Sequence, residues 1–312
     1  MATFFDVRIG ARTLGGFELA TRALDLIADL EGRLTVYRDD SELSRVNATA
    51  HLGPVDTERE LFQLLRTAEA IHSLTEGAYD ATSGALSVAW GFFKGPKRIP
   101  DSETLADARA RTGQKLVVLD PENQTVFFKR RGVTINLGGI GKGYAIDRAA
   151  ETIRHHWMPT SALIHGGQSS LYALGSPPGE FGGRWKVALR NPFDPERSLG
   201  TFRLRDRGLG TSGDAFQRFE VGGRVFGHIL DPRTGEPADG STSASVTVLA
   251  PSATLADALS TAFYLLGPDA SASILERLPD VAAIFVEEGP SVRGFNLSEE
   301  DFEANKDILV TL

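Results

Sequence analysis

The residues NLGGIGKGYAID, Asn136–Asp147, join a short predicted strand at Val133–Leu137 to a predicted helix at about Tyr144–His155. Glycines at such a junction let backbone N–H groups approach an oxyanion, and the start of the helix adds a favourable dipole. Lys142 can neutralise a phosphate oxygen there. The stretch is not a Walker loop, because no Ser or Thr follows the lysine. It predicts a phosphate cradle, with a plain structural junction as the alternative.

The elements on either side of this stretch favour an α+β fold, with antiparallel sheets and packed helices. A strand pattern at Phe4–Ile9 precedes a helix pattern at Phe17–Leu30, whereas Tyr37–Asn47 is polar and turn-rich. After Asp147, short strands alternate with Gly, Pro, Asn and Asp, which is typical of antiparallel pairing. No repeat or linker divides the chain, so we expect a single domain over residues 1–312. Other predicted elements are helices at about Asp56–Leu74, Asp101–Arg111 and Leu255–Leu266, and a hairpin of Leu116–Leu119 with Thr125–Phe128.

The composition excludes several kinds of chemistry and partner. A net charge of −8 and a pI near 5.4 give no long-range attraction to nucleic acid or to an anionic membrane. The absence of cysteine excludes disulfides, thiolate metal sites and cysteine nucleophiles. The chain shows no apolar run long enough to span a membrane, no signal peptide pattern and no lipobox cysteine. We therefore expect a cytoplasmic protein without membrane insertion.

Asp257 and Thr261 lie four residues apart in the stretch LADALSTAFYLLG and so share one face of an otherwise apolar helix. A carboxylate on such a helix requires a partner when it is buried. Hard oxygen ligands suit Mg²⁺, which commonly takes one or two protein groups together with water and substrate phosphate oxygens. The alternative is that Asp257 interacts only with the helix dipole and that Thr261 bonds back to its own helix.

The stretch GHILDPRTGEP, Gly227–Pro237, ends a predicted strand in a tight turn. Asp231 can hold the turn through its side chain. An unperturbed imidazole titrates near neutral pH, so His228 is a candidate catalytic residue, although a lone histidine is more often a structural hydrogen-bonding group. Neither a GxSxG elbow nor an HExxH zinc motif is present, which excludes those two hydrolase classes.

The order and spacing of these motifs resemble the ApbE family of FAD:protein FMN transferases over nearly the whole chain. The resemblance also runs through SELSRVN at Ser41–Asn47, TEGAYDATSGAL at Thr75–Leu86 and Thr211–Gly213. It implies a T-fold-like α+β domain. It also implies Mg²⁺-dependent transfer of FMN from FAD to a Ser or Thr hydroxyl of an acceptor protein, with release of AMP. The acceptor would carry a motif like D-x-x-[ST]-G-A-[ST].

The resemblance also assigns roles to individual residues. Mg²⁺ would be held by Asp257, Thr261 and the main-chain carbonyl of Gly141. His228 is the predicted general base, and Asp231 would orient or replace it. Asp257→Ala is expected to abolish turnover and leave the fold intact. The residues predicted to contact FAD are Asn47, Tyr79, Gly139, Lys142, Thr211, Ser212 and His228.

The chain departs from the family pattern at several positions. Family members often have Asp where this chain has Asn136, Ala where it has Gly141, and a second His where it has Gly227. Gly-Asp-Ala-Phe at 213–216 replaces the usual Gly-Asp-Tyr. The departures at Asn136 and Gly227 leave a non-catalytic FAD-binding protein as one alternative. A Mg²⁺-dependent FAD pyrophosphatase that yields FMN and AMP is another, because it would use the same site as the transferase. A third, weaker hypothesis is self-flavinylation at Ser83, because DATSGAL nearly fits the acceptor motif.

Overall fold

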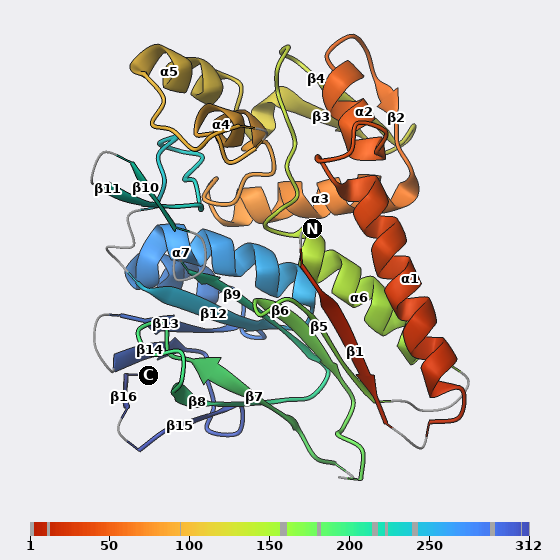
Figure 1. Cartoon of the computed structure of the whole chain (residues 1–312), viewed down its shortest axis with the longest axis vertical. Coiled ribbons are helices and arrows are strands. Elements are labelled where there is room, and N and C mark those ends of the chain that lie inside the picture. The colour runs from red at the N-terminus through yellow and green to blue at the C-terminus, as the bar shows by residue number, and fades with distance from the viewer. Residues whose placement is uncertain are drawn as a thin grey trace. The chain divides into compact units, whose positions relative to one another are not determined.

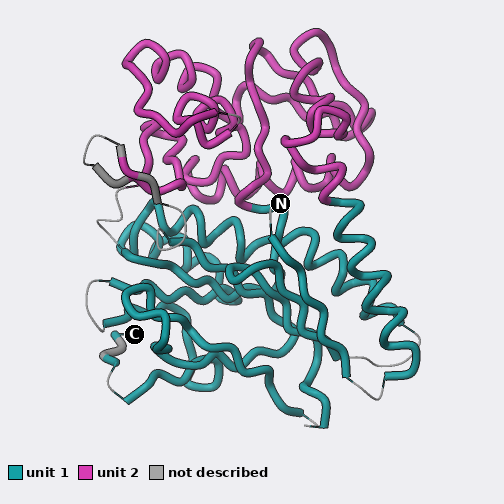
Figure 2. The backbone as a smooth tube through the Cα atoms, in the orientation of Figure 1, with its two compact units in different colours: residues 1–30, 140–215, 242–312 teal, residues 31–139, 216–241 magenta. Residues whose placement is uncertain are grey.

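The computed structural model describes residues 3–10, 13–93, 95–156, 161–179, 182–213, 218–221, 224–238, 243–287, 291–306 and 308–311. The chain divides into two compact units, which Figure 2 shows in teal and magenta. The first unit contains residues 1–30, 140–215 and 242–312, and the second contains residues 31–139 and 216–241. The expected single domain over residues 1–312 stays a prediction.

The first unit is built on an eight-stranded sheet in the order β1-β5-β6-β9-β12-β13-β14-β16 (Figure 1). Every neighbouring pair is antiparallel except β14 and β16. The strands are β1 (Phe5–Ile9), β5 (Ala162–Gly166), β6 (Ser170–Leu174), β9 (Arg207–Gly213), β12 (Ser245–Ala250), β13 (Ala282–Val286), β14 (Ser291–Phe295) and β16 (Leu309–Thr311). The predicted α+β fold with antiparallel sheets is thereby confirmed.

A second, three-stranded sheet packs against one face of the large sheet (Figure 1). Its order is β15-β8-β7, and its strands are β7 (Trp185–Arg190), β8 (Ser198–Leu204) and β15 (Phe302–Ala304). Leu209 and Ile284 of the large sheet belong to the same buried cluster as Phe202 and Phe302. The two phenylalanine rings lie 4.9 Å apart between centroids. One core of the first unit therefore lies between the two sheets.

Two helices, α6 (Gly141–Arg154) and α7 (Ala253–Leu275), cover the other face of the large sheet (Figure 1). Helix α7 is buried along most of its length, as its nearly uninterrupted apolar sequence predicts. Its regular part ends near Leu266, where the sequence predicts the end of the helix, because Gly267 has φ 74° and precedes Pro268. The chain then resumes a helical path to Leu275.

Close backbone contacts fix where α7 lies. A Cβ atom at Gly143 of α6 would stand 2.2 Å from the carbonyl oxygen of Ala253. A Cβ atom at Gly210 of β9 would stand 2.5 Å from the carbonyl carbon of Ala256 and 2.6 Å from the backbone nitrogen of Asp257. Any larger side chain at either glycine would push the helix away. These two glycines therefore place Asp257 directly over β9 and beside the first turn of α6.

The second unit contains several helices and a small sheet in the order β2-β4-β3 (Figure 1). Trp90 packs against Phe226 at 5.5 Å between ring centroids and donates from Nε1 to the carbonyl of Gly235 at 2.9 Å. These contacts join Phe226 and Gly235 to the rest of the unit. Its elements are α2 (Glu42–Thr49), β2 (Val55–Asp56), α3 (Arg59–Leu74), α4 (Gly84–Ala89), α5 (Ser102–Ala110), β3 (Val117–Asp120), β4 (Thr125–Phe128), β10 (Arg218–Val221) and β11 (Arg224–Gly227), and α1 (Gly16–Leu34) ends in it.

Two local predictions are wrong in the second unit. The polar stretch at Tyr37–Asn47 contains helix α2, since Ser41 caps it by accepting from Ser44 N at 3.0 Å and two apolar side chains of the helix are buried. The predicted strand at Val133–Leu137 forms only an isolated bridge between Ser83 and Thr134. A side chain takes the place of a partner strand, because the carboxamide of Asn47 bonds both backbone groups of Ile135.

In the part of the chain that the structure describes, no helix is both long enough and apolar enough to cross a membrane.

Candidate functional site

Asp257 is the centre of a polar cluster in the first unit and is only 3% exposed. Its Oδ1 accepts from Ser170 Oγ at 2.9 Å and from Lys142 Nζ at 3.1 Å. Its Oδ2 accepts from the backbone N–H of Gly143 at 3.1 Å and also lies 3.3 Å from Lys142 Nζ. The prediction that a carboxylate on this apolar helix needs a partner is confirmed.

The glycine-rich stretch begins α6 three residues earlier than predicted, at Gly141. The first N–H groups of a helix have no acceptor within it, and here Gly143 donates to the Asp257 carboxylate. The side-chain ammonium group of Lys142 forms an ion pair with the same carboxylate. The cradle that the sequence predicts for phosphate therefore binds an anionic group in the structure, namely the chain's own Asp257. Contact of Lys142 with a phosphate stays a prediction.

A row of hydroxyl groups links β9 to α7 next to Asp257. Ser212 Oγ lies 2.8 Å from Ser260 Oγ and 3.3 Å from Thr261 Oγ1. Thr261 also donates to the backbone carbonyl of Asp257 at 3.3 Å, which is the back-bonding alternative considered for this residue. The structure thus brings Ser212, Asp257 and Thr261 together, with Gly141 one residue from Lys142 at the start of α6.

Thr211 lies apart from this cluster. Successive residues of a strand point to opposite faces, and Ser212 faces α7. Thr211 instead bonds Thr247 of β12, with 3.0 Å between the two hydroxyl oxygens. Thr211 and Ser212 are both predicted to contact FAD, but their side chains lie on opposite faces of the sheet.

Asp147 ties α6 to α7 from the other end of the glycine-rich stretch. Its two carboxylate oxygens accept from the backbone N–H groups of Ala253 and Thr254, each at 2.8 Å, and from the hydroxyl of Thr254. These are the first N–H groups of α7, so the carboxylate caps that helix. Burial raises the pKa of Asp147 although these three donors lower it.

In the second unit, Asn47 has a clear structural role. Its Nδ2 donates to the carbonyl of Ile135 at 2.9 Å, and its Oδ1 accepts from the N–H of Ile135 at 2.8 Å. Asn136 directly follows Ile135, and its Oδ1 accepts from Gly138 N at 2.9 Å, next to the partly exposed Gly139. A carboxylate oxygen could accept the same bond, so the Asp-to-Asn departure at 136 preserves this turn. The flavin contacts predicted for Asn47 and Gly139 stay predictions.

Tyr79 is buried, and its backbone is bonded at both ends. Its N–H donates to Thr75 Oγ1 at 3.1 Å, and its carbonyl lies 3.1 Å from Nδ1 of His72. The same ring nitrogen lies 3.2 Å from Oδ2 of Asp80, and this hydrogen bond raises the pKa of His72 above its ordinary value. Stacking of Tyr79 on a ligand stays a prediction, whereas the His72–Asp80 pair is a feature that the sequence did not predict.

Asp231 organises the predicted turn. Its carboxylate accepts from the backbone N–H of Arg233 at 2.8 Å and from the guanidinium at 2.7 and 2.9 Å, and its carbonyl accepts from Gly235 N at 2.7 Å. Gly235 has φ 81°, which favours glycine at this position. His228 directly follows β11 and is partly exposed. The bonds of Asp231 thus run within its turn, and the roles of His228 and Asp231 in proton transfer stay predictions.

The DATSGAL stretch, Asp80–Leu86, is a buried part of the second unit. Asp80 Oδ1 accepts from both the N–H and the hydroxyl of Thr82, at 2.7 and 2.6 Å. Ser83 is the residue before α4, and Gly84 donates to the carbonyl of Thr134 at 3.1 Å. A segment packed in this way does not present Ser83 as an acceptor peptide. The structure therefore favours an ordinary structural role for DATSGAL over self-flavinylation at Ser83.

Asp214–Phe216, the departure from the family pattern after Gly213, lies outside the described residues.

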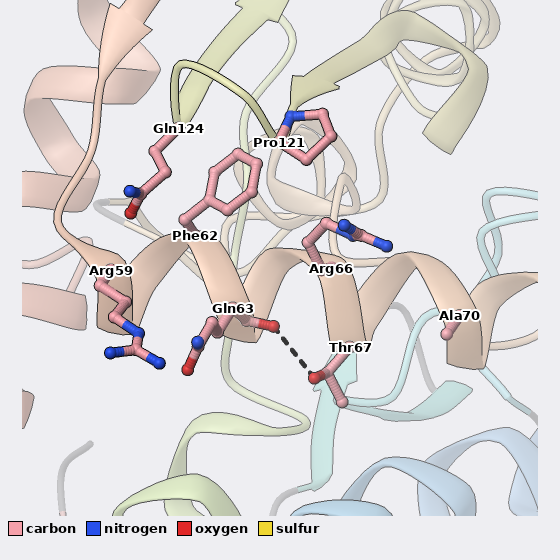
Figure 3. A pocket seen from close by; sticks show the side chains of 8 residues that line it. All are labelled: Arg59, Phe62, Gln63, Arg66, Thr67, Ala70, Pro121 and Gln124. Atoms are coloured by element: carbon pink, nitrogen blue, oxygen red, sulfur yellow. Dashed lines mark hydrogen bonds between the residues drawn. The ribbon is translucent and has the colours of Figure 1, made fainter.

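A surface pocket of about 680 Å³ lies on α3 in the second unit (Figure 3). Arg59, Gln63 and Arg66 line it from the exposed side of the helix, with Pro121 and Gln124 from the turn between β3 and β4. It contains no residue that the sequence assigns to the site.

The chain is similar in sequence to proteins of known activity. A model of the ApbE family matches residues 1–285. The FAD:protein FMN transferase of Klebsiella pneumoniae is 31% identical over 269 residues, which cover 86% of this chain and 82% of that protein. The FAD:protein FMN transferase of Haemophilus influenzae is also 31% identical, over 81% of this chain and 73% of that protein.

Solved structures extend the likeness to the fold. The ApbE protein of Thermotoga maritima is similar with a TM-score of 0.82 at 29% identity, over 97% of this chain and 96% of that chain. The flavin transferase ApbE of Vibrio cholerae is similar with a TM-score of 0.78 at 26% identity, over 98% of this chain and 94% of that chain. The sequence comparison and the structure comparison therefore point to the same family, and each covers most of this chain.

Proposed function

This chain belongs to the ApbE family, and we propose that it is an FAD:protein FMN transferase. A Ser or Thr hydroxyl oxygen of an acceptor protein forms a bond to the phosphorus of the FMN half of FAD. The bond from that phosphorus to the bridging oxygen breaks, AMP leaves with this oxygen, and the hydroxyl proton passes to a base. The substrates are then FAD and an acceptor protein, and the acceptor motif D-x-x-[ST]-G-A-[ST] and a cytoplasmic location belong to the proposal.

The observation that carries the proposal is the position of the Asp257 carboxylate. Asp257 belongs to α7, and its carboxylate is bonded to the first turn of α6. The side chain is buried, yet it is ionisable and bound by one ammonium, one hydroxyl and one backbone N–H. Phosphoryl transfer needs groups that position phosphate oxygens and offset their charge more than it needs covalent chemistry from the protein. Lys142 and the first turn of α6 offer such groups directly, and Asp257 would do so through a bound cation.

Magnesium would be held by Asp257, Thr261 and the carbonyl of Gly141. These donors are a carboxylate, a hydroxyl and a carbonyl, which are hard oxygens of the kind that Mg²⁺ prefers. Among the described residues, no three His, Cys, Asp or Glu side chains gather as a metal site. A metal here would complete its shell with water and substrate phosphate oxygens. When bound, it would offset charge that develops on those oxygens.

His228 is the proposed base for the acceptor hydroxyl, because an imidazole that titrates near neutral pH can accept that proton. Asp231 would orient His228 or replace it as the base. Ser212 and Lys142 are the proposed FAD contacts that lie nearest to Asp257 in the first unit.

The test is incubation of the protein with FAD, Mg²⁺ and a peptide that carries the acceptor motif. Chromatography measures AMP, and mass spectrometry measures FMN attached to the peptide. We expect both products in the wild-type protein and neither in Asp257→Asn. Ser271→Ala, which alters a buried hydroxyl elsewhere on α7, is the matched control and should remain active.

The products separate the proposal from its alternatives. AMP with free FMN and an unmodified peptide would replace transfer with pyrophosphate hydrolysis. Binding of FAD without release of AMP would make the chain a non-catalytic flavin-binding protein.

A further inference from the structure

Ser170, the first residue of β6, is 2% exposed and donates its only hydroxyl proton to Oδ1 of Asp257 at 2.9 Å. The two residues are 87 positions apart in the chain. A buried hydroxyl bonded to a buried carboxylate restricts the plane and direction of that carboxylate.

The sheet is built so that Ser170 can reach α7. Its two cross-strand neighbours are Gly166 of β5 and Gly210 of β9, which carry no side chains. Gly210 also allows the backbone of residues 256 and 257 to lie directly on β9. Because neither neighbour adds a side chain of its own and α7 approaches β9 closely, the hydroxyl of Ser170 is brought under Asp257.

The donors around Asp257 differ in their freedom to move. Gly143 N belongs to the backbone of α6, and Ser170 is anchored in the middle of a sheet, with β5 on one side and β9 on the other. Lys142 reaches Asp257 through a flexible four-carbon stem. A cation that binds Asp257 can therefore displace Lys142, whereas the other two donors keep their bonds.

We propose that Ser170 is a positioning residue that orients Asp257 for a divalent cation. The inference rests on the proposed metal role of Asp257. Ser170 bonds one carboxylate oxygen and Gly143 N bonds the other, while Lys142 Nζ lies 3.1 and 3.3 Å from the same two oxygens. Groups that orient a metal ligand in this way commonly change metal affinity by about 10- to 100-fold when they are removed.

The experiment is a titration of the full chain with Mn²⁺, which occupies oxygen sites of the magnesium type. The electron paramagnetic resonance signal of free Mn²⁺ gives the dissociation constant without FAD or turnover. We expect Ser170→Ala to weaken Mn²⁺ binding about tenfold. Ser271→Ala is the matched control, because Ser271 is equally buried and donates to the carbonyl of Gly267 at 2.7 Å within α7. It should bind Mn²⁺ as the wild-type protein does.

Equal affinity in Ser170→Ala and the wild type would overturn the inference, as would an equal loss in both serine variants. Thermal unfolding of each variant shows whether it is folded at the titration temperature. AMP release from FAD by the wild type is measured alongside. If the wild type releases AMP but Ser170→Ala keeps its affinity, only this inference fails. If the wild type neither binds Mn²⁺ nor releases AMP, the proposed function fails with it.

Discussion

Lys142 Nζ lies 3.1 Å from Oδ1 and 3.3 Å from Oδ2 of Asp257, and the two residues form a largely buried ion pair. Removing one member of such a pair leaves the other charge without compensation in a medium that solvates it poorly. Removing either residue alone is therefore expected to destabilise the first unit, so the pair has a structural role as well as belonging to the candidate site. A metal bound to Asp257 would share the carboxylate with Lys142 or displace it.

Lys142→Met should lower the free energy of unfolding by about 3 kcal/mol in the absence of metal, because Asp257 then keeps an uncompensated charge. Mg²⁺ should restore part of the loss, since a ligand that binds only the folded state stabilises it. Urea unfolding with and without Mg²⁺ measures both effects. Equal stability of variant and wild type would show that the pair contributes little.

Asp257→Ala is expected to lower stability by a similar amount, because Lys142 and Gly143 N lose their acceptor. The sequence alone predicts an intact fold for this variant, and the contacts add this loss of stability to the expected loss of turnover. The double variant Lys142→Met/Asp257→Ala should recover much of the stability but no turnover. That result separates the structural role of the pair from its role in the reaction.

Gly143→Ala should destabilise the protein by about 3 kcal/mol, although alanine is the better helix former. The new methyl group would stand 2.2 Å from the carbonyl oxygen of Ala253, so α7 would have to move away from α6. Gly32 in α1 is the matched control, because a Cβ atom there meets only Arg38 Nη1, at 3.5 Å. Gly32→Ala should stabilise by up to about 1 kcal/mol. Thermal unfolding of both variants checks the opposite signs.

The sequence predicted those elements that have a clear periodicity or turn chemistry. The hairpin of β3 and β4, helix α3 and the end of the regular part of α7 at Gly267 follow from such local patterns. The sequence does not predict helix α2, because polar residues dominate this stretch and only the capping Ser41 and the buried Leu43 and Val46 support a helix. The residues 133–137 have the composition of a strand, but the segment forms only an isolated bridge to Ser83, and the side chain of Asn47 bonds the backbone of Ile135.

The candidate site was predictable only in part. A carboxylate on an apolar helix requires a partner, and that requirement was visible in the sequence at Asp257. The partners Lys142 and Ser170 lie 115 and 87 residues away, so their identity depends on the tertiary fold. Nothing in the sequence around Ser170 distinguishes it from other serines that begin strands. The His72–Asp80 pair was missed for a related reason, since the pairing depends on the turn between helix α3 and Asp80.

Asp147→Ala should lower the free energy of unfolding by about 3 kcal/mol, because two buried N–H groups at the start of α7 lose their acceptor together with the tie to α6. Asp101 is the control, since it caps α5 from an exposed position, where it accepts from Thr104 N at 2.7 Å. Asp101→Ala should lower stability by only about 1 kcal/mol. Urea unfolding of both variants measures the difference, and equal losses would show that Asp147 acts only as an ordinary cap.

The His72–Asp80 hydrogen bond should make stability depend on pH above the ordinary histidine range. The bond raises the folded-state pKa of His72 above 6.5, so the folded protein binds this proton more tightly than the unfolded chain. Its contribution is fully present below about pH 6.5 and is lost as the pH rises through the raised folded pKa.

His72→Gln should therefore lie below the wild type in unfolding free energy at acidic pH, and the gap should narrow with rising pH. Asp80→Asn, which keeps one acceptor oxygen for Thr82, should lower the titration midpoint of the His72 ring in NMR spectra. A midpoint that does not change in Asp80→Asn would mean that the carboxylate is not the cause of the raised pKa.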